Sequence, residues 1–597
     1  MANRSFFAEL KRRNVLRAAA LYVGAAWALS QGVAQLLPVF DFPNWVVRWF
    51  VIAVVIGFPF AMLFSWYYEW TPHGIQRESE VDADASVTRA TDKKLDRWII
   101  AILIVAVVLL LANTFVLHKD ADVDIAPGKS VAVLPLLNES GDPQQDYFSD
   151  GLSEELISAL GQVRDLKVIG RNSSFQFRGK QQDDNAGIGR KLGVATLLEG
   201  TVRKLGDQIR IVASLINASD GSQLWSQTYD RQLKDVFAVQ SEIATSVAGA
   251  LKTTLLGKTI ESADRPPSGN LDAYNAFLQG KFYAARRNRD DYAKAVGYFQ
   301  KAIALDPDYA LAYARLAIAE QWFNDWVANG DERKIASAQA RANAIKAVEL
   351  APDSALALGA LGINQAWSNF DYPSADATLK KAVKLDPSNP EILYQLADVT
   401  ACLGRLDEAV AMMRNVLRLE PLNASYHFYT GQFLLAMEHF DAAQTELQRA
   451  VDLQPNAEVF RAYLAIALLE RGQSDQALEV AKTEPQDANR RWALAQIHFA
   501  RHEDAQGEST LKEMLRLDAN YGPSNIAMVY AMRGNSDQAF LWLNRALAIR
   551  DPGVATMYEL PYLIPKLRKD PRLAVLLKKL NLPTPDEVGA QSADSGK

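Results

Sequence analysis

Three stretches near the N-terminus carry no charged side chain for twenty residues each, at positions 18–37, 49–68 and 98–117. An α-helix rises about 1.5 Å per residue, so each stretch is long enough to cross the hydrocarbon layer of a membrane, which is about 30 Å thick. The pattern predicts a membrane module over residues 1–117 with three transmembrane helices, followed by a polar stalk at 118–128. A cleaved signal peptide is the alternative for the first stretch, but no small-residue cleavage site separates it from the second.

Lysine and arginine are concentrated before the first predicted helix and in the loop 69–97, whereas the connection between the first two helices contains only Arg48. Because positively charged loops stay in the cytosol, this distribution predicts a cytosolic N-terminus. The chain after about residue 118 is then periplasmic, if the membrane is a bacterial inner membrane. The predicted cytosolic parts are too short to bury a core, so no cytosolic kinase, cyclase or winged-helix domain is expected.

The first predicted helix has a small residue at every fourth position, and these residues share one face. Small side chains at this spacing let helices approach closely in a membrane. Two interpretations of this candidate helix-packing face remain open, namely packing within the three-helix module and a homodimer through transmembrane helix 1. The face consists of Ala20, Gly24, Ala28 and Gly32.

After the stalk the pattern changes to short apolar runs that alternate with helical periods. Compact apolar or alternating runs are typical of strands, and apolar residues at helical spacing are typical of amphipathic helices. The order of these segments predicts a mixed α/β domain over 129–258, in which helices cover a mixed sheet. The strand candidates are 130–136, 166–170 and three runs within 196–231, and the main helix candidates are 147–163 and 236–256.

Charged residues form two groups in this predicted domain. Acidic residues around the start of the 147–163 helix are expected to complement the positive end of the helix dipole. Basic residues are a candidate patch for an anion such as a lipid headgroup or a cell-wall polymer, with an ordinary solvated surface as the alternative. This candidate basic patch consists of Arg171, Arg178, Lys180, Arg203 and Lys204.

From about residue 268 to 552 the chain repeats with a period close to 34 residues. Prolines end successive helical segments at this spacing, as at Pro387, Pro421 and Pro455, because proline cannot continue the helical hydrogen-bond ladder. The pattern predicts an all-α solenoid of about eight helix pairs. The unit that ends at Pro485 is short by four residues. Capping helices are expected over 553–584 and a disordered tail over 585–597.

The 34-residue period is that of tetratricopeptide (TPR) repeats. The strings SVAVLPLLNESGDPQQDYFSDGLSEELISAL, RNSSFQFRGK and IRIVASLINASDGSQLWSQTYDR closely resemble the TolB N-terminal-like, FlgO-type domain of bacterial envelope and sensory proteins. The N-terminal FFAELKRRNVLRAAALYVGAAWAL resembles the membrane module often placed ahead of that domain. Some relatives carry a cyclase or a DNA-binding domain at the N-terminus. Neither is expected here, so their regulatory output does not transfer.

The first helix of each repeat lines the concave face in TPR families, and aromatic residues occupy the matching positions here. The ladder of Lys, Arg and Asn with which several TPR domains grip a peptide carboxylate is missing. Two hypotheses follow, a groove for an apolar or extended peptide segment, or packing of these rings against neighbouring repeats or the α/β domain. The candidate partner groove consists of Tyr394, Phe428, Tyr429, Tyr463, Trp492 and Phe499.

Composition narrows the function further. The net charge of −6 gives no basic field for nucleic acid, and the single Cys402 excludes disulfide frameworks and multi-cysteine metal sites. No nucleophile–base pair or metal constellation is visible, so no catalytic residue, metal or cofactor is predicted.

The sequence therefore predicts a non-catalytic, multi-domain protein that has transmembrane α-helices, a mixed α/β domain and an all-α TPR solenoid. Its predicted function is that of a periplasmic scaffold or adaptor, anchored in the inner membrane, that binds protein or peptide partners through the TPR array and the FlgO-like domain. The alternative is a component of a transmembrane signalling system that relays a periplasmic binding event to a separate cytosolic protein.

Overall fold

The computed structural model describes residues 129–163, 165–179, 184–251, 265–286, 288–327, 330–520 and 522–595, with short pieces at 57–58, 68–71 and 74–77. The chain divides into two compact units, Met1–Asp122 and Val123–Lys597. In the first unit, strands β1 (Tyr68–Thr71) and β2 (Gly74–Arg77) form an antiparallel hairpin.

The predicted transmembrane helices lie outside the described residues, except for Gly57, Phe58 and Tyr68 of the second. The stalk and the candidate helix-packing face also lie outside them. Among the helices that are described, none has the length and apolar character needed to span a membrane. The membrane module therefore stays a prediction.

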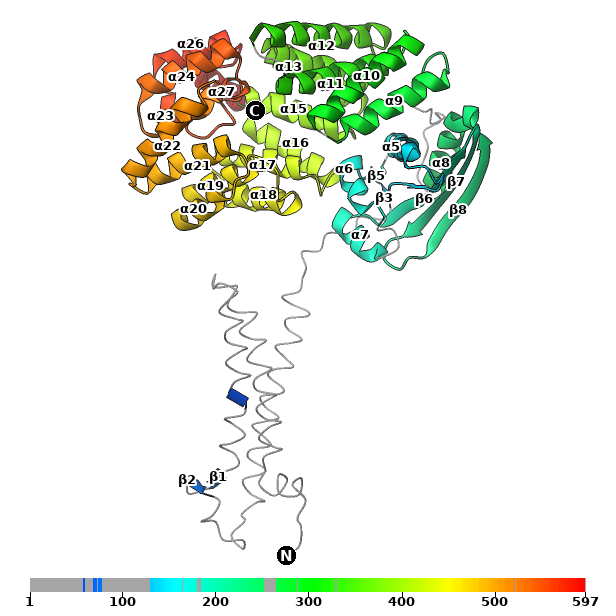
Figure 1. Cartoon of the computed structure of the whole chain (residues 1–597), viewed down its shortest axis with the longest axis horizontal. Helices are drawn as coiled ribbons and strands as arrows, with labels where there is room; N and C mark the ends of the chain where they lie inside the picture. The colour runs from blue at the N-terminus through cyan, green and yellow to red at the C-terminus, as the bar shows by residue number, and fades with distance from the viewer. Residues whose placement is uncertain are drawn as a thin grey trace, which may run out of the picture. The chain divides into compact units, whose positions relative to one another are not determined.

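A mixed sheet opens the second unit (Figure 1), which confirms the sequence-based prediction of a mixed α/β region. Its strand order is β5–β3–β6–β7–β8, with β4 also paired to β6. The pairs that involve β3 are parallel, and the β6–β7 and β7–β8 pairs are antiparallel. The strands are β3 (Ser130–Val133), β4 (Leu137–Asn138), β5 (Lys167–Val168), β6 (Thr196–Leu205), β7 (Gln208–Asn217) and β8 (Gln223–Gln232).

Alternation along β7 shows how the sheet buries one face. Ile209, Ile211 and Leu215 are buried, whereas Gln208 and Arg210 between and beside them are exposed. The buried residues join one apolar cluster with the helices that cover this face, as expected for a strand with period two. The helices of the domain are α5 (Asp146–Gly161), α6 (Arg171–Ser174), α7 (Asn185–Leu192) and α8 (Val236–Ala250).

The described residues that follow form eight antiparallel helix pairs, which confirms the predicted solenoid. Within a pair the two helices pack at van der Waals distance. A Cβ added at Gly431 would lie 2.6 Å from the side chain of Leu447 on the partner helix, which explains the small residue at that crossing. The pairs are α9 (Leu271–Ala284) with α10 (Arg289–Leu305), α11 (Ala310–Val327) with α12 (Gly330–Leu350), α13 (Ala355–Asn369) with α14 (Tyr372–Leu385), α15 (Pro390–Cys402) with α16 (Leu406–Leu419), α17 (Ala424–Ala436) with α18 (Phe440–Leu453), α19 (Phe460–Glu470) with α20 (Ser474–Lys482), α21 (Asp487–Ala500) with α22 (Asp504–Leu517), and α23 (Pro523–Met532) with α24 (Ser536–Ile549).

The short sixth unit loses its residues from the second helix. Helix α20 has 9 residues, whereas α18 and α22 on either side have 14 each. The deletion seen in the sequence therefore removes more than one helical turn, since a turn takes 3.6 residues.

A buried acidic residue at the end of the second helix stabilises the start of the first helix in several repeats. Asp306 accepts a hydrogen bond from Ser268 N (3.0 Å), Glu484 from Val459 N (2.8 Å), and Asp551 from Ser524 N (2.9 Å). A carboxylate in this position satisfies backbone N–H groups that have no partner within the helix. The acids that precede Pro307, Pro485 and Pro552 thus have a structural role.

Glu420 is the acid at this position in the fourth repeat, and it binds the α/β domain instead. Its carboxylate accepts hydrogen bonds from Asn172 N (3.0 Å) and Ser173 N (2.7 Å) at the start of α6. Gly170 N also donates to Leu419 O at 2.9 Å. Together with Leu422, which lies in an apolar cluster of the α/β domain, these contacts form a clasp between the domain and the array. The clasp consists of residues 170–173 and 419–422.

The chain after the repeats differs from the prediction. Helices α25 (Leu563–Leu567) and α26 (Pro571–Lys579) lie in the predicted capping region, but the tail is not disordered, because Pro585–Ser595 form helix α27. The cause is a capping box: Glu587 Oε2 accepts from Thr584 N at 2.7 Å and Thr584 Oγ1 accepts from Glu587 N at 3.4 Å.

Replacing Thr584 by alanine is expected to destabilise α27 by about 1 kcal/mol, since one N-terminal donor loses its side-chain acceptor. Hydrogen–deuterium exchange of the 586–590 amides measures the change. Thr510→Ala is the matched control, because the Thr510 hydroxyl donates to Gln506 O within α22 and supports no helix end. Equal exchange in wild type and Thr584→Ala would contradict the capping role.

Candidate functional site

Five of the six predicted groove residues form a continuous row along the first helices of successive repeats. The ring centroids of Tyr394 and Tyr429 are 4.9 Å apart, those of Phe428 and Tyr463 are 5.2 Å apart, and those of Tyr463 and Trp492 are 5.1 Å apart. The structure therefore brings these five rings together. The sixth residue, Phe499, packs elsewhere, with its ring next to Gly507 of α22 and under the guanidinium of Arg533.

The row is not an open groove. Trp492 is 1% exposed, Phe428 and Tyr463 are each 6% exposed, and Tyr394 and Tyr429 are partly buried. The hypothesis of a peptide groove requires partly exposed rings, so the packing hypothesis describes Trp492, Phe428 and Tyr463. A segment outside the helix pairs belongs to the same apolar cluster and brings Glu559 near Tyr463.

This segment consists of residues 551–563 and is here named the strap. It runs from the end of α24 to the start of α25. The strap contacts repeats far away in the sequence. Glu559 binds Cys402 of α15 and Gln432 of α17, and the Tyr562 hydroxyl donates to Glu470 of α19. Its apolar side chains are buried in the cluster of the repeats. They are Val554, Ala555, Met557, Leu560 and Leu563.

The surface of α15, α17 and α19 that the strap contacts is here named the channel. A pair of buried carboxyl groups, Asp398 and Glu559, lies there. The Cys402 thiol donates to Glu559 Oε1 at 3.1 Å and Gln432 Nε2 donates to Glu559 Oε2 at 3.3 Å. Burial raises the pKa of Asp398 to about 7. Burial also raises the pKa of Glu559 well above its ordinary value, and the neighbouring Asp398 raises it further. The pair is therefore stable in the protein when at least one carboxyl is protonated.

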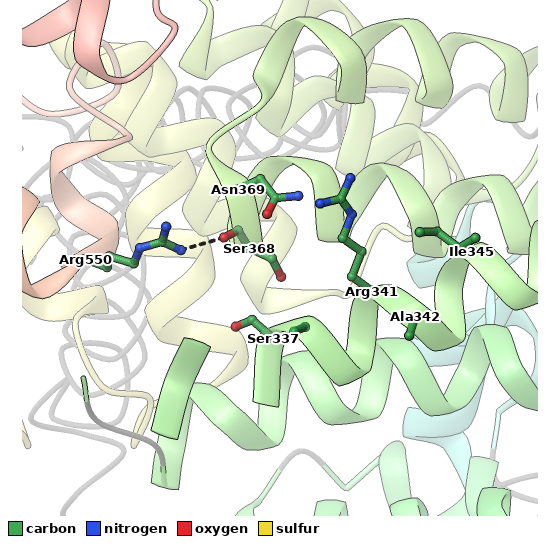
Figure 2. Close-up of a pocket in the computed structure, with 8 residues that line it drawn as sticks. Ser337, Arg341, Ala342, Ile345, Ser368, Asn369 and Arg550 are labelled. Carbon is green, nitrogen blue, oxygen red and sulfur yellow. Dashed lines mark hydrogen bonds between the residues drawn. The ribbon is translucent and has the colours of Figure 1, made fainter. Parts of the chain in front are cut away.

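The start of the strap is held at a recess of about 410 Å³ between α12 and α13 (Figure 2). Arg550, the residue before the strap, donates from Nη1 to Ser368 O at 2.7 Å. Ser337, Arg341 and Asn369 also line this recess. Since Ser368 lies near the end of α13, this bond ties the last repeat to the third.

The candidate basic patch is divided by ion pairs with the acidic residues of α5. Arg171 pairs with Glu154, and Arg178 Nη2 lies 2.6 Å from Asp150 Oδ1. Burial disfavours the Glu154 carboxylate, but Lys281 and Arg171 outweigh that effect and lower its pKa. Asp150 and Glu154, which were expected to complement the positive end of the helix dipole, thus form ion pairs with the basic residues.

The remaining described members of the patch make other contacts. Arg203 Nε donates to Glu139 O at 3.4 Å, and Lys204 Nζ lies 5.1 Å from the centre of the Phe148 ring. Lys180 is outside the described residues. The structure does not bring the described members together as one free basic surface. Within the described ranges, no group of three or more His, Cys, Asp or Glu residues is arranged to hold a metal ion.

Comparison with known proteins identifies the repeats. Family models of the tetratricopeptide repeat match residues 366–428, 402–458 and 434–491. The C-terminal helical array therefore carries TPR repeats, as the sequence predicted, and such repeats point to protein partners.

A protein of Rhizobium meliloti named "Putative adenylate cyclase 3" is 37% identical over 199 residues, which are 33% of this chain and 34% of that protein. The chain thus spans about a third of that relative's length. Among solved structures, the human IFIT1 dimer with m7Gppp-AAAA is similar at a TM-score of 0.34 and 15% identity, over 53% of this chain and 78% of the other. A thermophilic TPR protein of Thermus thermophilus has a TM-score of 0.28 and 21% identity, over 33% and 99%. Since both scores are below 0.5, the repeat assignment rests on the family models.

Proposed function

We propose that this chain is a non-catalytic scaffold that is anchored in a bacterial inner membrane and binds protein partners on the periplasmic side. The single observation that carries the proposal is the array of TPR repeats, a fold whose extended surface serves protein–protein interaction. The clasp at Glu420 supports the scaffold role, because it joins the α/β domain and the repeats into one unit for binding.

Membrane anchoring is supported by the three uncharged stretches at 18–37, 49–68 and 98–117 and by the distribution of Lys and Arg around them. The resemblance to the TolB N-terminal-like, FlgO-type domain and to the module ahead of it supports a place in the bacterial cell envelope. The face at Ala20, Gly24, Ala28 and Gly32 suits a homodimer through transmembrane helix 1.

The second candidate function is that of a component of a transmembrane signalling system. The similarity to the Rhizobium meliloti protein favours it, because cyclases produce intracellular messengers and that protein's name is "Putative adenylate cyclase 3". In this proposal the chain itself is not the cyclase. It relays a periplasmic binding event through the membrane helices and the loop 69–97 to a separate cytosolic protein.

Site-specific photo-crosslinking in cells tests the scaffold and separates it from the relay. A photoreactive amino acid replaces an exposed apolar residue of the array, Leu541 or Ile335, or else Val87 in the loop 69–97. The scaffold predicts that mass spectrometry finds a specific protein captured from the array positions. The relay predicts an additional cytosolic protein captured from position 87. No specific capture from either array position would contradict the scaffold.

Reporter fusions test the orientation. A reporter that is active only in the periplasm is expected to work when it is fused after residue 129 and to fail when it is fused within 75–95, because three crossings separate the N-terminus from the repeats. A cytosol-specific reporter at the same two positions is the control and should give the opposite result. The reverse pattern would reject the periplasmic scaffold.

A further inference from the structure

The strap lies on the first helices of the repeats, which in TPR arrays form the surface that binds partners. Its contact at Glu559 is unfavourable for a segment that is permanently part of the core. Glu559 is 1% exposed and lies near the buried Asp398. Isolated buried charge is strongly disfavoured, and two carboxyls that share a site cannot both ionise without a large penalty. The strap is therefore attached through a contact that is stable only while at least one of the two carboxyls is protonated.

The groups that face this carboxyl pair do not compensate it with positive charge. Beside Asp398 itself, they are Tyr394 and Cys402 from α15, Gln432 from α17, Tyr372 from α14 and Tyr463 from α19. All of these described groups are acidic or neutral. The buried Tyr372 hydroxyl, which both carboxyls influence, has no hydrogen-bond partner among the described residues. With the strap bound, the polar groups of the channel are thus not all satisfied by hydrogen bonds.

Backbone geometry at both ends of the strap adds strain. Arg550, directly before it, has φ of 57°, and Tyr562, near its end, has φ of 71°. Residues with a side chain rarely adopt this left-handed region, so each position is strained when the surrounding contacts impose it. Arg550 is the C-cap of α24, whereas Tyr562 lies within the strap, so release of the strap would relax Tyr562 while it solvates Glu559 and Asp398.

We propose that the strap is a displaceable occupant of the TPR channel, which a protein partner replaces with an extended segment of the same chemistry, one carboxylic side chain flanked by tyrosine, leucine and proline. The proposal rests on the function proposed above and names the kind of partner that the channel accepts. The strap itself supplies the template in the residues around Glu559, which read MYELPY. The channel offers that carboxyl a thiol and an amide donor, and offers its neighbours the aromatic row.

Displacement should depend on pH with a definite sign. The pKa of Asp398 is about 7 with the strap bound, well above the ordinary value for an exposed carboxyl. The bound state therefore holds a proton that the released state gives up, and its stability falls as pH rises between about 4 and 7. Burial and the neighbouring Asp398 also raise the pKa of Glu559, so the loss continues above pH 7. The strap should therefore open more often at pH 8 than at pH 5.5.

Cys402 reports the opening directly, because it is the single cysteine of the chain, is fully buried and contacts Glu559. The full chain in detergent is labelled with 4,4′-dithiodipyridine, a thiol reagent that works at both pH values, over a series of low urea concentrations. Rates are normalised to the fully denatured chain at the same pH. If the strap opens locally, labelling is at least 100-fold faster than global unfolding allows and changes little with urea.

Two variants provide the matched comparison. Asp398→Asn removes one carboxyl of the pair and should slow the normalised labelling at pH 8 at least tenfold, with a smaller effect at pH 5.5. Asp407→Asn, at an exposed position of α16, should leave the rate unchanged. Both measurements complement the wild-type experiment, which needs no substitution and stays informative if a variant fails to fold.

A peptide tests the chemistry of the occupant. A fluorescent peptide with the sequence of residues 553–566 is expected to bind the full chain, and the same peptide with Glu559→Lys should bind at least tenfold more weakly. Three results would overturn the proposal: labelling with the rate and urea dependence of global unfolding, equal binding of the two peptides, or labelling that slows with rising protein concentration, which would indicate a strap exchanged between two copies. Capture from Leu541 or Ile335 does not require an open channel, so the scaffold function can survive each of these results.

Discussion

Replacing Trp492 by alanine is expected to lower the free energy of unfolding by about 3–5 kcal/mol. The indole is 1% exposed and packs against Tyr463, with 5.1 Å between the ring centroids. Removal of a large buried ring loses its transfer free energy and leaves a cavity that the surrounding helices fill only in part. Urea denaturation of the full chain, followed by circular dichroism, measures the loss.

Leu541→Ala is the control for this measurement, because Leu541 is 58% exposed and its truncation should change stability by less than about 0.5 kcal/mol. The result decides between the two sequence-based hypotheses for the aromatic row. A loss below 1 kcal/mol for Trp492→Ala would restore the open groove, whereas a loss in the expected range assigns the ring to the core under the strap.

Glu420→Ala should weaken the clasp between the α/β domain and the repeats by about 3 kcal/mol. The substitution leaves Asn172 N and Ser173 N without the carboxylate that accepts from them at 3.0 and 2.7 Å. Each buried donor without an acceptor costs about 1–3 kcal/mol. Because the change acts on one contact between the two parts, amide exchange in 169–178 should increase before exchange in the repeats does.

Glu408→Ala in α16, the helix that ends directly before Glu420, is the matched control. Glu408 is half-exposed and pairs with Arg405 three residues earlier at 3.1 Å, and such surface pairs contribute only about 0.3–0.5 kcal/mol. If Glu420→Ala increased exchange no more than Glu408→Ala, the clasp would not be what holds the two parts together.

Local patterns were sufficient to predict the helix pairs and the strands. The 34-residue period depends on contacts between neighbouring helices, such as Gly431 against Leu447, so both partners of each contact lie within one repeat of the sequence. The same reasoning explains why the row from Tyr394 to Trp492 was identified correctly, since a repeating unit places equivalent positions side by side.

The strap could not be predicted in this way. The sequence around Glu559 has no helical or strand period, and its place depends on Cys402, which lies 157 residues earlier. Asp398 and Cys402 are four residues apart on α15, so the sequence predicts that they share a face of the helix. That this face binds the Glu559 carboxyl is visible only in the structure, where the strap lies against it. The same limit applies to Glu420, whose partners Asn172 and Ser173 belong to another domain.

The tail was mispredicted for a different reason. Its composition of small and polar residues is typical of disorder, yet the four residues TPDE at 584–587 carry a capping signal that could have been read locally. Val588 then packs beside Tyr558 and Gly404, which stabilises the first turn from outside.

The route of the strap changes how this array should lose its structure. A simple repeat array behaves as a one-dimensional chain of units, in which each unit is coupled only to its neighbours and unfolding begins at an end. Here the hydrogen bond between Glu559 and Cys402 links the segment after the eighth helix pair to the fourth, and Arg550 links it to the third through Ser368 O. Removal of the last repeats by truncation would therefore expose the middle of the array, and the whole solenoid should unfold in a single cooperative transition.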